Sequence, residues 1–109
     1  MTPGKTASQA GHAYLGAYLQ ALQQNPQLAA EYCSEHPESP GTKVCLEGNI
    51  NRIMQAKAEA ERLGIPHFLV VDSGCANFFD GKPTITALGL GPAKKHEIQT
   101  ITRRFQLVP

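Results

Sequence analysis

The spacing of apolar residues at the start of the chain predicts a long amphipathic helix. Thr2 is a suitable N-cap, Pro3 suits the first helical position, and Asn25-Pro26 ends the helix. Small and apolar residues recur at three- and four-residue intervals and predict the buried face: Ala7, Ala10, Gly11, Tyr14, Leu15, Tyr18 and Leu22. A second stripe at the same spacing predicts a polar face: Lys5, Gln9, His12 and Gly16.

The remaining pattern alternates helices and strands. The clearest element is a helix with an apolar stripe from Ile53 to Leu63, followed by Gly64 as a left-handed cap and by Pro66. The run His67 to Val71 has almost no polar residue, as in a strand that is covered on both faces. Further elements are a short helix over 27–33, strands over 42–47 and 84–90, and a last helix from about Lys94 to Arg104.

This order of elements predicts a three-layer α/β/α domain with a small mixed sheet, formed by residues 1–109 as a single unit. Three strands make a thin sheet for two layers of helices. The chain also starts directly with a helix. We therefore expect that one strand is missing in front of that helix.

Composition and charge narrow the possible functions. Apolar residues make up 41% of the 109 residues, which is typical of a globular protein. The formal net charge is only +1, so any binding to a polyanion has to be local. The apolar run Phe68 to Val71 is far shorter than the ~18 residues of a membrane span. Three cysteines form neither a disulfide framework nor a zinc pattern, which favours a cytoplasmic protein.

Gly4 and Lys5 are the first candidates for chemistry. A lysine in the first helical turn opposes the helix dipole, and such a local conflict often marks a functional site. Free backbone amides together with the ammonium group would hold a phosphate or a developing oxyanion. The alternative is a solvated lysine at a frayed chain end.

Asp72 follows a buried strand, at the edge of the sheet where α/β proteins often bind ligands, and is a candidate general base. The alternative is an Asx turn that caps the next residues. His12 lies on the same polar stripe as Lys5, although a lone helical histidine is more often structural. Thr84 and Thr86 alternate with apolar residues, so their hydroxyls should share one side of the sheet. This spacing also fits simple β-propensity.

Basic residues gather on the last helix. Lys94, Lys95 and His96 open it, and Arg103 and Arg104 close it. These residues could form a local patch that contacts phosphates. A solvated helix face explains them about as well.

Taken together, these motifs resemble the type II peptidyl-tRNA hydrolases, from Met1 to about Val108. Four segments carry the resemblance in the family's order: a Gly-Lys followed by Gln and His-Ala within Pro3 to Ala13, Leu63-Gly64-Ile65-Pro66 leading to Val71-Asp72-Ser73-Gly74, the strand Thr84 to Gly89, and Gly91-Pro92 before the final helix. The resemblance implies hydrolysis of the ester between peptide and tRNA, without a metal or organic cofactor and without a membrane.

The resemblance also implies roles for individual residues. The family's Lys, Gln and His positions correspond to Lys5, Gln9 and His12, its Asp to Asp72 and its strand Thr to Thr84. Asp72 would activate water, Lys5 would stabilise negative charge, and Thr84 would hydrogen-bond substrate or water. We expect the four residues Gly4, Gln9, Lys94 and Lys95 to bind the substrate.

The chain departs from the family at two places. Where the family usually has an Arg and a Thr after Asp-x-Gly, this chain has Cys75 and Ala76, which bears on turnover more than on fold. Met1 falls where an internal residue would be, so we expect a shortened reading frame with an open sheet edge that favours a homodimer. The alternatives are a catalytically silent relative that binds RNA or a protein partner, and an unrelated phosphate-binding module.

Overall fold

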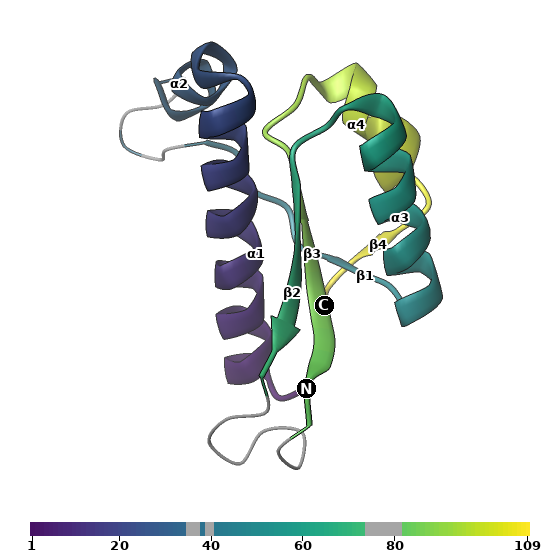
Figure 1. Cartoon of the computed structure of the whole chain (residues 1–109). Coiled ribbons are helices and arrows are strands. Elements are labelled where there is room, and N and C mark those ends of the chain that lie inside the picture. Colours follow the sequence, from purple (N-terminus) through teal and green to yellow (C-terminus); the bar gives the residue numbers. More distant parts are fainter. Residues whose placement is uncertain (35–37, 39–40, 74–81) are drawn as a thin grey trace.

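Helices lie on both sides of a central pair of strands (Figure 1). The computed structural model describes residues 1–34, 38, 41–73 and 82–109. The helices in these residues are α1 (Pro3–Gln24), α2 (Pro26–Ser34), α3 (Ile50–Leu63) and α4 (Lys95–Thr102). The strands are β1 (Leu46–Glu47), β2 (His67–Asp72), β3 (Thr84–Leu90) and β4 (Gln106–Leu107).

The central pair, β2 and β3, is antiparallel. Its register runs from the pair His67 and Leu90 at one end to the pair Asp72 and Thr84 at the other. A bulge between Val70 and Val71 shifts the register. Helix α1 packs against one face of this pair, and α3, with α4 beside it, packs against the other (Figure 1). The predicted three-layer α/β/α arrangement is confirmed.

The predicted single mixed sheet is not formed by the described residues. The strand expected over 42–47 is reduced to β1, which pairs antiparallel with β4, an element that the sequence pattern did not predict. A cavity of about 430 Å³ lies between β3 and the segment 44–48. Cys45 accepts one further backbone hydrogen bond, from the N–H of Val108 at 3.0 Å, but residues 42–45 belong to no strand.

The predicted buried face of α1 was wrong for several residues. The buried stripe is Gln9, Ala13, Ala17 and Ala21, whereas Ala7, Gly11, Leu15 and Leu22 are exposed. The reason is the short distance between α1 and β3. A Cβ atom added at Gly89 would lie 2.1 Å from the carbonyl oxygen of Ala13. Only small side chains fit between the two elements, so the large ones face outward.

The prediction of α3 is confirmed at its C-terminal end. Gly64 has a φ of 71° and donates its N–H to the last carbonyls of the helix. At the other end, Asn49 caps the helix by accepting the N–H of Arg52 at 2.9 Å. The core beneath it is small and consists of Ala56, Ala60, Ile65 and Ile101, with Leu88, Leu90, Ala93 and Phe105 against it.

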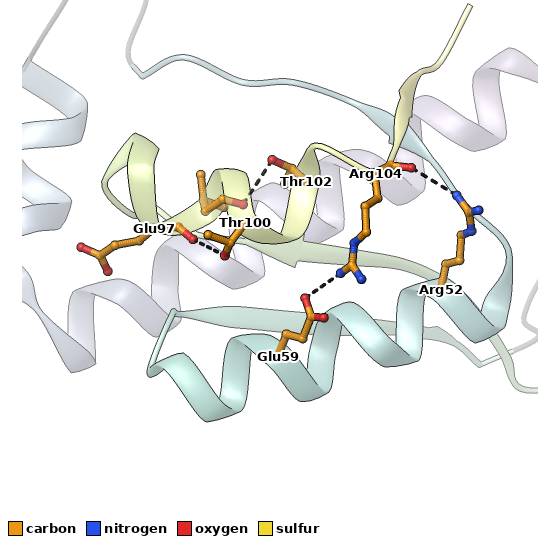
Figure 2. Close-up of polar contacts among 7 residues, drawn as sticks. Arg52, Glu59, Glu97, Thr100, Thr102 and Arg104 are labelled. Carbon is orange, nitrogen blue, oxygen red and sulfur yellow. Dashed lines mark hydrogen bonds and ion pairs between the residues drawn. The ribbon is translucent and has the colours of Figure 1, made fainter.

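The end of α4 is attached to α3 by two arginines (Figure 2). Arg104 Nη2 lies 2.7 Å from Glu59 Oε2, and Arg52 Nη1 donates to the carbonyl oxygen of Arg104 at 3.2 Å. Helix α4 ends at Thr102. Arg103 and Arg104, which were expected to be the last residues of this helix, come after its end. None of the helices in the described residues is both long and apolar enough to cross a bilayer.

Candidate active site

A buried glutamine joins the three elements that carry the candidate residues. Gln9 on α1 is only 2% exposed and is the buried polar side chain among the described residues. Its Nε2 donates to Asp72 Oδ2 at the end of β2, over 3.0 Å. Its Oε1 accepts the hydroxyl of Thr86 on β3, over 2.6 Å. We call these two hydrogen bonds, which join Thr86, Gln9 and Asp72, the polar relay.

The fold brings these residues together for local reasons. Gln9 begins the small-residue stripe of α1, and Ala13 one turn later lies against Gly89. This close approach places the Gln9 side chain at the surface of the strand pair. Asp72 is the last residue of β2, and the bulge at Val70 and Val71 leaves Thr86 as the additional residue on β3.

Lys5 lies one helical turn before Gln9, so the two side chains leave α1 on the same face. Lys5 is half-buried, and its backbone N–H donates to the hydroxyl of Thr2 at 3.3 Å. A Cβ added at Gly4 would meet no atom within 4 Å, so there is open space beside the first turn. Lys5, Gly4 and the polar relay thus share one end of the molecule.

Thr84 takes a different position from Thr86. Its hydroxyl donates to the carbonyl oxygen of Lys82 at 3.1 Å, whereas the hydroxyl of Thr86 belongs to the polar relay. The strand pattern singled out both threonines as residues of one side. It could not separate them, because the bulge that shifts the register leaves no signal in the alternation.

Three further expected site residues are not part of the polar relay. His12 is exposed to solvent on α1. Lys94 and Lys95 follow the far end of β3, where Leu90 pairs with His67, whereas Asp72 pairs with Thr84 at the near end (Figure 1). At ~3.3 Å per residue, the length of β3 separates these lysines from Asp72 by about 20 Å. The structure therefore does not bring them to the polar relay.

Cys75 and Ala76, which stand where the family usually has an Arg and a Thr, lie outside the described residues. Within the part of the chain that the structure describes, no three His, Cys, Asp or Glu side chains are grouped so that they could hold a metal ion. The hydrogen-bonded groups of the candidate site are the Asp72 carboxylate, the buried amide of Gln9 and the Thr86 hydroxyl, and Lys5 lies one helical turn before Gln9.

Comparison with known proteins identifies the family of this chain. The sequence model of the family described as Peptidyl-tRNA hydrolase PTH2 matches residues 1–108. The chain is 34% identical to a peptidyl-tRNA hydrolase of Methanopyrus kandleri over 109 residues, covering 99% of this chain and 88% of the relative. It is 33% identical to one of Methanocaldococcus jannaschii over 108 residues, covering 99% and 90%. A probable peptidyl-tRNA hydrolase 2 of Dictyostelium discoideum is 31% identical over 109 residues, which are 98% of this chain and 49% of that protein. The chain therefore belongs to the PTH2 family of peptidyl-tRNA hydrolases.

Proposed function

We propose that this chain hydrolyses the ester bond that joins a peptide to the terminal ribose of tRNA. The observation that carries the proposal is the Asp72 carboxylate, held by a buried amide at the end of β2, with Lys5 one helical turn from that amide. The family supplies the substrate class, since its members are peptidyl-tRNA hydrolases.

The proposed reaction needs no group besides water and these side chains. Asp72 takes a proton from a water molecule, whose oxygen attacks the ester carbonyl carbon. The Lys5 ammonium stabilises the negative charge that develops on the carbonyl oxygen. When the tetrahedral intermediate collapses, the bond to the ribose oxygen breaks, and that oxygen takes up the proton that Asp72 accepted from water. The products are a free peptide carboxyl group and tRNA with a free ribose hydroxyl.

The start of α1 is the proposed binding place for the acceptor end of the tRNA. Gly4 leaves open space there, and no acidic residue lies in the first turn to repel a phosphate. Helix N-termini bind phosphates through their free amides. Lys94 and Lys95 are exposed at the far end of β3, and we propose that they contact the body of the tRNA instead of its reacting end.

We also propose that the protein is located in the cytoplasm, where peptidyl-tRNA is made. In addition, we propose that it forms a homodimer. Leu15 and Leu19 are 58% and 50% exposed one turn apart on α1, and Phe68 of β2 is 42% exposed. Burial of such side chains against a second copy is favourable. Light scattering tests this point, since Leu19→Lys should shift a dimer to a monomer. A monomeric parent chain would refute the homodimer.

Release of peptide from peptidyl-tRNA tests the proposed activity. We expect Asp72→Ala and Lys5→Ala each to lower the rate by at least ~100-fold, because each removes a group that acts on the reacting atoms. Glu97→Gln, at an exposed position in the first turn of α4, is the control and should keep the parent rate. Full activity of both alanine variants would refute the mechanism. Binding of peptidyl-tRNA by the parent chain without cleavage would favour a catalytically silent relative.

A further inference from the structure

We propose that Gln9 is a positioning residue that fixes the Asp72 carboxylate, and that the Thr86 hydroxyl fixes Gln9 in turn. This inference rests on the proposed function, because it concerns the carboxylate that activates water there. It differs from the sequence-based expectation, in which Gln9 binds substrate and Thr84 is the strand hydroxyl of the site.

Burial argues against direct contact between Gln9 and substrate. Gln9 is 2% exposed, and both ends of its amide already have partners within the protein. A buried amide is costly unless it is hydrogen-bonded, and here both polar atoms are satisfied. A substrate would have to displace one of these bonds in order to reach it. The contacts of Gln9 therefore indicate a role inside the protein.

The chemistry of the three groups sets the direction of the relay. An ionised carboxylate only accepts hydrogen bonds, so Gln9 must present its Nε2 to Asp72. The Oε1 of the same amide then faces Thr86, where it needs a donor. A hydroxyl supplies one, whereas a methyl group does not. Because the Thr86 hydroxyl donates to Oε1, it favours the amide orientation in which Nε2 faces the Asp72 carboxylate.

The relay connects elements that are far apart in the sequence. Gln9 and Asp72 are 63 residues apart, and Gln9 and Thr86 are 77 residues apart. A carboxylate at the last position of a strand keeps rotamer freedom unless a neighbour restricts it. The bond from Gln9 on α1 restricts the Asp72 carboxylate in this way. General-base catalysis depends on such placement, because an error of about 1 Å lowers a rate by about 100-fold.

Steady-state kinetics of peptide release separates a positioning role from substrate binding. We expect Gln9→Met and Thr86→Val to lower kcat by about 10- to 100-fold while KM changes less than about 3-fold. Thr86→Ser keeps the hydroxyl and should recover most of kcat. The double variant Gln9→Met with Thr86→Val should lose no more than Gln9→Met alone, because both act through one bond to Asp72.

Two further threonines provide comparison variants. Thr100→Val removes a hydroxyl on the exposed side of α4, whose partner is the carbonyl oxygen of Glu97, and should leave kcat unchanged. Thr84→Val tests the competing assignment, and we expect a smaller loss of kcat than for Thr86→Val. A larger loss for Thr84→Val would overturn the relay, and so would a rise in KM at constant kcat for Gln9→Met.

Nuclear magnetic resonance tests the relay without any activity. The side-chain amide protons of Gln9 should exchange with solvent far more slowly than those of exposed Gln20. Their resonances should shift in both Asp72→Asn and Thr86→Val. Fast exchange of the Gln9 amide in the parent chain would refute the relay. If the parent chain releases no peptide but the Gln9 amide is protected, the proposed function fails and the relay stands.

Discussion

Replacement of Gly89 by alanine should damage both the fold and the site, because α1 lies unusually close to β3 there. The new Cβ would lie 2.1 Å from the carbonyl oxygen of Ala13, whereas real Cβ atoms essentially never come closer than 3.0 Å. The helix or the strand must therefore move by about 0.9 Å or more. Gln9 stands one turn before Ala13 on the same face of α1, so the movement reaches the polar relay.

The expected size of the effect follows from these distances. A shift of α1 by about 0.9 Å carries the 2.6 Å and 3.0 Å bonds of Gln9 toward or past the limit for a hydrogen bond, near 3.5 Å. Overpacking of this kind costs about 1–3 kcal/mol. For a domain of this length, that corresponds to a decrease in Tm of about 5–15 °C. The rate of peptide release should decrease as well, because the Asp72 carboxylate is no longer held.

Thermal unfolding followed by circular dichroism, together with the peptide-release assay, measures both effects. Gly11→Ala is the matched control, because a Cβ at Gly11 meets nothing within 4 Å and alanine favours a helix over glycine by about 1 kcal/mol. This control should keep its activity and gain stability. If Gly89→Ala unfolds at the parent temperature and releases peptide at the parent rate, then α1 does not pack on β3 as described.

Three further predictions concern stability. Ile101 is the largest fully buried side chain among the described residues, so Ile101→Ala should lower the free energy of unfolding by about 2–5 kcal/mol in urea titrations. An unchanged midpoint would contradict the described core. A hydrogen bond from Lys57 lowers the pKa of the Glu61 carboxyl below its ordinary value of 4.5. The parent chain should therefore be more stable than Lys57→Met at neutral pH, and this difference should vanish as the pH falls below 4.5 and Glu61 becomes protonated. A difference that does not decrease as the pH falls below 4.5 would exclude this cause. Met1 lines the 430 Å³ cavity. An extended apolar segment fused ahead of Met1 should therefore fill the cavity and raise Tm, whereas the same segment with a central proline should not.

Local signals allowed much of the fold to be predicted from sequence. The α3 helix has a cap at each end and a regular apolar stripe, and the structure confirms its C-terminal boundary at Gly64. The strand Thr84 to Leu90 was also predicted with its observed bounds. In contrast, β4 is two residues long and exists only through its pairing with β1. Such an element has no periodicity of its own, so the sequence cannot reveal it.

The candidate site was only partly predictable. Lys5 and Asp72 were predicted from their positions at the ends of elements, and Gln9 from the polar stripe and the family resemblance. Gln9 and Asp72 are in contact in the structure. The choice between Thr84 and Thr86 depends on the bulge opposite Val70 and Val71, which is a property of the paired strands. The remote location of Lys94 and Lys95 follows from the antiparallel register, and this too requires the partner strand.

The error about the buried face of α1 and the position of the site have one physical cause. An amphipathic helix is expected to bury its large apolar residues and to expose its polar ones. Here Gly89 allows the α1 backbone to approach so closely that only alanines fit, and Leu15 and Leu19 face outward. Gln9 belongs to the buried stripe because Asp72 and Thr86 satisfy its amide there. Of the stripe that looks polar in sequence, Gln9 is therefore the residue that packs, and it does so beside the carboxylate that we propose to react.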